Sequence, residues 1–133
     1  LVFRYAEVLL SLAEAINEQV GPTGEALGFA NQVRARSELP AWEGLSQAAF
    51  RDSLLAQRGR ELFAAGMRRQ DLIRHGKFIE YALEDGAEAE PHHVLFPIPR
   101  GVIQESEGVV TQNCGYSNAG PDCYPHQNRY QGQ

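Results

Sequence analysis

Apolar residues recur every three or four positions along the first part of the chain, which is the spacing of one face of an α-helix. The pattern predicts a first helix over residues 2–19, ended by a Gly-Pro pair, and a second helix over residues 24–37. Thr23 stands where it can cap the second helix. Two helices joined by such a short turn predict an antiparallel helical hairpin, residues 1–39.

A second pair of helices follows a connector that contains Pro and Gly. Ser46 can cap a helix over residues 47–65, and a shorter helix over residues 68–75 follows the break that Gly66 predicts. Gly59 costs its helix up to about 1 kcal/mol relative to Ala, which indicates a close packing contact at that position.

The helical pattern fades from residue 77 onward. Residues 78–83 and 102–106 are each expected to form no more than a short helical turn. Residues 94–99 are expected to be extended, because each of their two prolines disfavours helix at the residue before it. The whole pattern predicts an all-α fold, with a helical hairpin over residues 1–39, a further pair of helices over residues 46–76 and an irregular, loop-rich tail over residues 77–133.

Composition limits the kind of protein this can be. The chain has 133 residues, 43% of them hydrophobic, which is enough for one modest core. A net charge of −5 argues against a nucleic-acid partner, because binding phosphates needs clustered Lys and Arg. The chain lacks an apolar run of about 20 residues and starts within a helical pattern without an initiator Met, so we expect it to be part of a longer protein.

Cys114 and Cys123 lie nine positions apart in a stretch rich in Gly, Asn and Pro. A disulfide in an oxidising compartment is favoured over two free thiols. By chain entropy it would stabilise the fold by somewhat less than about 3 kcal/mol. Two thiols do not form a zinc site alone, and no His is spaced to complete one.

The residues that could carry catalysis or bind a metal are few. Four helix-borne carboxylates could in principle form the acid pair of a glycosidase, but their helical context favours structural ion pairs, so no catalytic residue is predicted. They are Glu7, Glu14, Glu61 and Asp71. The adjacent His92 and His93 would point to opposite faces of a strand, so no metal site and no cofactor are predicted.

Trp42, the single tryptophan, is a weak candidate for ligand binding. It lies in the connector before Ser46, where an exposed ring could stack on a sugar. The favoured alternative is a ring folded back over the helix ends.

Residues 58–77 carry many Arg and Lys side chains around two helical pieces separated by Gly66. Their spacing favours a network of ion pairs, in which Asp71 can pair with Arg68 or Arg74. A nucleic-acid patch is the alternative, but apolar residues of the same segment need a core and occupy much of its surface.

The same segment resembles the C-terminal signature of the SusD/RagB family. The residues that match in order and spacing are Arg58, Glu61, Leu62, Gly66, Arg68, Asp71, Leu72, Arg74 and Gly76. Residues 4–15, 31–36, 97–99 and 111–116 resemble further motifs of the family. Departures occur at Gln57, where an acidic residue is common, and at Ala65, Arg69, Gln70 and Cys114.

The resemblance implies a C-terminal part of a SusD/RagB-like domain with tetratricopeptide-like hairpins. Such proteins are surface lipoproteins of the outer membrane in Bacteroidetes-like bacteria. They bind glycans or other nutrients without catalysis and deliver them to a TonB-dependent, SusC-like transporter. Their lipid anchor lies in the N-terminal part, which this chain lacks. The alternative function is a helical-repeat module that binds a protein or peptide.

The resemblance also assigns roles to particular residues. Five signature residues are expected to hold the helices in register, namely Arg58, Glu61, Arg68, Asp71 and Arg74. We call them the signature residues. The ligand-binding residues of the parent protein are expected to lie mostly outside this chain.

Overall fold

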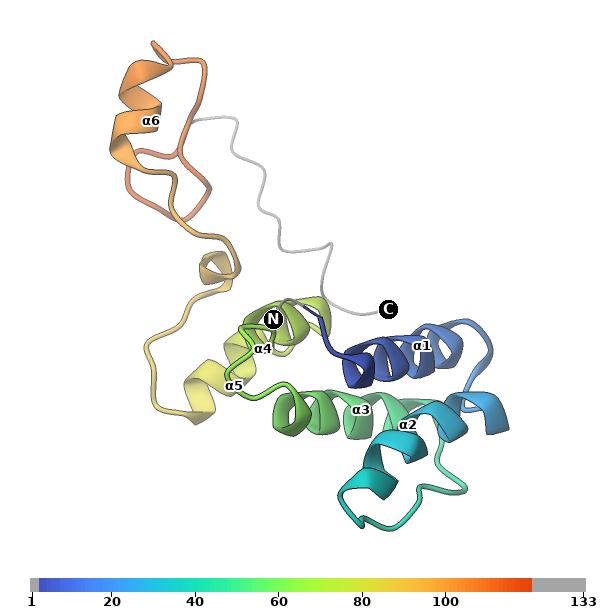
Figure 1. The fold of residues 1–133 in the computed structure, drawn as a ribbon. Coiled ribbons are helices and arrows are strands. Elements are labelled where there is room, and N and C mark those ends of the chain that lie inside the picture. The colour runs from blue at the N-terminus through green and yellow to red at the C-terminus, as the bar shows by residue number, and fades with distance from the viewer. Residues whose placement is uncertain (1–2, 121–133) are drawn as a thin grey trace. The chain divides into compact units, whose positions relative to one another are not determined.

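The computed structural model describes residues 3–120, as helices joined by turns and loops (Figure 1). The chain divides into two compact units, unit 1 (Leu1–Arg68) and unit 2 (Arg69–Gln133). The helices are α1 (Tyr5–Val20), α2 (Gly24–Arg36), α3 (Gln47–Glu61), α4 (Arg68–Arg74), α5 (Phe78–Glu84), the 3₁₀ turn η1 (Pro91–Val94) and α6 (Arg100–Glu105). Within residues 3–120, the β pairing is one isolated bridge between Gln112 and Ala119. The predicted all-α class is confirmed.

Unit 1 has an apolar core between its three helices. α1 packs against both α2 and α3, and the three lie side by side in Figure 1. Small residues on α1 and α2 allow these helices to approach closely, while Phe50 and Leu54 of α3 fill the remaining space. The buried cluster consists of Leu9, Leu10, Ala13, Ala26, Ala30, Val33, Phe50 and Leu54.

Both predicted helix caps are confirmed. The Thr23 hydroxyl accepts a hydrogen bond from the Ala26 backbone N–H at 3.2 Å. The Ser46 hydroxyl accepts one from the Ala49 N–H, also at 3.2 Å. Each satisfies a donor that the first turn of a helix leaves without a backbone partner.

Two helix boundaries of unit 1 differ from the prediction by three or four residues. α1 begins only at Tyr5, because the Arg4 backbone is extended and its guanidinium donates a hydrogen bond to the Glu61 carbonyl at 2.5 Å. α3 ends at Glu61 instead of residue 65, and left-handed turns follow at Ala64 (φ 59°) and Gly66 (φ 76°). The apolar periodicity extends beyond the start of α1 and beyond the end of α3, but tertiary contacts determine these two boundaries.

Unit 2 contains more helix than expected at two places. α5 is a regular helix over Phe78–Glu84, and α6 begins at Arg100, directly after Pro99. Val94 belongs to η1, so its predicted extended conformation is wrong, whereas Leu95 is extended (φ −106°, ψ 150°). Pro91 at the first position of η1 favours this turn, because the ring of proline sets φ near the helical value.

Candidate functional site

The signature residues Arg58 and Glu61 connect the helices of unit 1 through hydrogen bonds. Arg58 is almost fully buried, 3% exposed, and its Nη1 donates to the Ser11 hydroxyl of α1 at 3.0 Å. Both carboxylate oxygens of Glu61 accept from Arg36 Nη2 at 2.7 Å. Because the Glu61 carbonyl also accepts from Arg4, the end of α3 is bonded to the end of α2 and to the start of α1.

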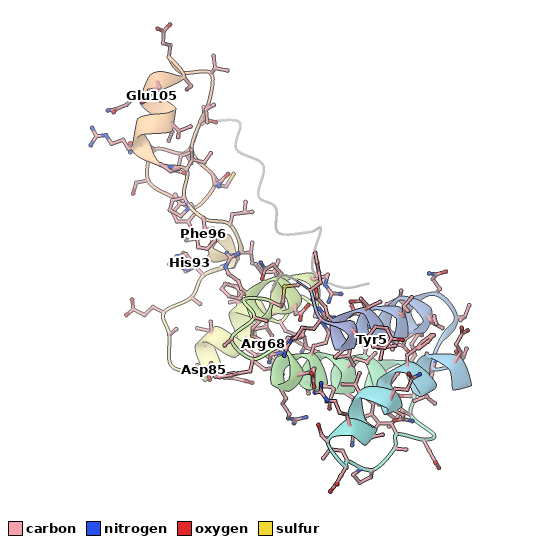
Figure 2. The ribbon with its side chains drawn as sticks, in the orientation of Figure 1. Tyr5, Arg68, Asp85, His93, Phe96 and Glu105 are labelled. Atoms are coloured by element: carbon pink, nitrogen blue, oxygen red, sulfur yellow. The ribbon has the colours of Figure 1, made fainter. Side chains whose placement is uncertain are left out.

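Arg68 lies over Gly59, where the prediction of a close packing contact is confirmed. Arg68 Nη1 donates to the Leu55 carbonyl at 3.1 Å. A Cβ atom at Gly59 would lie 2.9 Å from that same nitrogen, so a side chain there would displace the guanidinium, which is labelled in Figure 2. Glycine in the middle of α3 therefore allows Arg68 to reach the helix backbone.

Asp71 and Arg74 form an ion pair within α4. Asp71 Oδ1 accepts from Arg74 Nη2 at 2.8 Å, and the Asp71 side chain is only 4% exposed. Burial lowers the pKa of the Arg74 guanidinium from its ordinary value. Arg74 was one of the two partners predicted for Asp71.

Each of the five signature residues takes part in a polar contact. Arg58, Glu61 and Arg68 bond to other parts of unit 1, and Asp71 bonds to Arg74 in α4. The carboxylates of Glu61 and Asp71 both bind arginine, which is the ion-pair alternative to a catalytic acid pair. Their role in holding the helices in register stays a prediction.

The Trp42 ring is half-buried and packs against the core of unit 1, in the folded-back arrangement that the sequence favoured. Its centroid lies 5.9 Å from that of Phe50 in an edge-to-face contact, and the Arg34 guanidinium lies 4.2 Å above it. Its backbone exchanges two hydrogen bonds with the Asn31 side chain, at 2.8 and 3.1 Å. One face of the ring is therefore occupied by Arg34.

Arg34 also contacts Gln57, which stands where the family commonly has an acidic residue. Arg34 Nη1 donates to Gln57 Oε1 at 3.2 Å, and Gln57 is 3% exposed. Desolvation lowers the pKa of Arg34, and the positive charge of Arg60 lowers it further. The amide oxygen of Gln57 accepts the hydrogen bond without adding a negative charge at this buried position.

The two closing motifs of the sequence, around residues 97–99 and 111–116, are bonded to each other in unit 2. The Gln112 side chain accepts from the Ile98 N–H at 2.7 Å and donates to the Ile98 carbonyl at 2.9 Å. Asn113 donates to the Phe96 carbonyl, and the Tyr116 hydroxyl donates to the Leu95 carbonyl. Side chains thus supply the partners that a neighbouring strand would give this extended segment.

The sequence did not predict that the Arg69 guanidinium packs against two phenylalanine rings. The Arg69 guanidinium lies 4.0 Å from the Phe96 ring centroid and 5.1 Å from that of Phe78. Its Nη2 donates to the carbonyls of His93 and Val94. Arg69 was noted only as a departure from the family pattern. Nothing local in the sequence indicates contacts between residues so far apart.

The expectation that His92 and His93 point to opposite faces is wrong. They lie in η1, where their ring centroids are 4.1 Å apart, and the His92 ring meets Tyr116 edge to face at 4.6 Å. His93 Nδ1 accepts from the Glu90 N–H at 2.9 Å, so that nitrogen acts as a helix cap. In residues 3–120, no group of three or more His, Cys, Asp or Glu side chains is arranged to hold a metal ion.

Cys114 is disulfide-bonded. Cys123 lies outside the described residues, so the pairing of these two cysteines stays a prediction. No helix in the described part of the chain is both long enough and apolar enough to span a membrane.

Comparison with known proteins agrees with the resemblance. The family model described as the SusD family matches residues 1–116. The chain is 36% identical over 115 residues to SusD-like protein P25 of Formosa agariphila, covering 78% of this chain and 22% of that protein. It is 31% identical over 123 residues to the starch-binding protein SusD of Bacteroides thetaiotaomicron, covering 86% and 21%. The chain thus spans little more than a fifth of each relative. No solved structure gives a significant match.

Proposed function

Because this chain belongs to the SusD family, we propose that the protein containing it binds a nutrient, with oligosaccharides as the favoured class, and does not convert it chemically. The observation that carries the proposal is the family match over residues 1–116. The 31% identity to a protein named for starch binding supports a glycan in particular.

The proposed route places the protein on the outer membrane as a surface lipoprotein, with its lipid anchor outside this chain. There it delivers the bound glycan to a TonB-dependent, SusC-like transporter. Membership of the SusD family is the support for this location and this partner.

Within that protein we assign residues 1–133 a structural role. Three signature side chains bond to other protein groups: Arg58 to Ser11, Glu61 to Arg36 and Arg68 to Leu55. Trp42 packs against the core, with Arg34 over its ring. These contacts are typical of residues that stabilise a fold.

The test uses the complete purified protein. We expect a glycan array to identify an oligosaccharide ligand, calorimetry to measure its binding, and chromatography to recover it unchanged after incubation. An array without any bound glycan, or conversion of the ligand, would overturn the proposal.

The variant Trp42→Ala tests where the ligand binds. We expect its affinity to equal that of the original protein, with Trp42→Phe as the control that keeps an aromatic ring. Loss of binding in a Trp42→Ala protein that remains folded would place the ligand site in unit 1 and contradict the structural role.

A further inference from the structure

We draw no further inference here: the strongest candidate, the exposed ring of Phe96 in unit 2 with the Arg69 guanidinium stacked on it, is an apolar surface patch, and nothing in the structure shows what covers it.

Discussion

The two units are stabilised in different ways. In unit 1, eight buried apolar residues from three helices form one cluster, with Phe50, Leu10 and Leu54 as its largest fully buried members. In residues 69–120 of unit 2, Leu72 is the only buried apolar residue. Unit 2 relies instead on side chains that bond to the backbone, such as Gln112 to Ile98, and on ring stacking around Arg69.

The difference follows from how helical and extended segments satisfy their backbone hydrogen-bonding groups. Helices satisfy their own backbone groups, so their side chains are free to form an apolar core. An extended segment between loops has backbone groups without partners, and each one left buried and unsatisfied destabilises the fold. The polar residues of unit 2 are therefore as important to its structure as the apolar residues are to unit 1.

The largest effect is expected in the core of unit 1. Phe50→Ala removes a fully buried ring that also contacts Trp42, and should lower the free energy of unfolding by about 3–5 kcal/mol. Phe63→Ala is the control, because Phe63 is 83% exposed, and should change it by less than about 0.5 kcal/mol. Urea denaturation measures both. Similar effects for the two variants would show that unit 1 lacks the packed core described here.

A steric test of unit 2 compares two glycines with nearly equal φ. Gly108 (φ 89°) has open space around it, so Gly108→Ala should cost about 1 kcal/mol of backbone strain. At Gly115 (φ 87°) a Cβ would lie 2.4 Å from Cγ of His92, so Gly115→Ala should cost about 1–3 kcal/mol more. Thermal unfolding compares the two variants. Equal losses would mean that the close packing of Gly115 on His92 does not stabilise unit 2.

The ion pair of α4, in which the Asp71 side chain is buried, should have an intermediate effect. Asp71→Ala leaves Arg74 without this partner and should cost about 1–3 kcal/mol. Asp71→Asn should cost less, because the amide oxygen can still accept the hydrogen bond. Ligand affinity, measured by calorimetry on folded protein, should stay unchanged in both. Loss of ligand binding by folded Asp71→Ala would show that the signature acts in recognition as well as in structure.

The smallest effect is expected at a helix cap of unit 1. Ser46→Ala removes the acceptor of the Ala49 N–H and should cost about 1 kcal/mol in urea denaturation. Ser46→Asp should restore most of the loss, since Asp is also a good cap. If neither variant differs from the original protein, local capping adds nothing measurable to the core of unit 1.

Much of unit 1 could be predicted from the sequence. Apolar spacing predicted its helices, Thr23 and Ser46 predicted where two of them begin, and Gly59 predicted a close contact. These features depend on residues within a few positions of one another, so they are visible in a local pattern. The resemblance likewise pointed to the SusD family, which the match over residues 1–116 shows.

The tertiary structure decided what depends on residues far apart in the chain. α1 begins late because Arg4 bonds to Glu61, 57 positions away, and Arg69 stacks on Phe96 across 27 positions of chain. The error at His92 and His93 arose because an apparently extended segment folds as η1. The sequence by itself therefore determined the helices, their caps and the family. Only the folded chain decided where α1 begins, where α3 ends and which side chains hold the loops, because those choices depend on contacts that no local pattern contains.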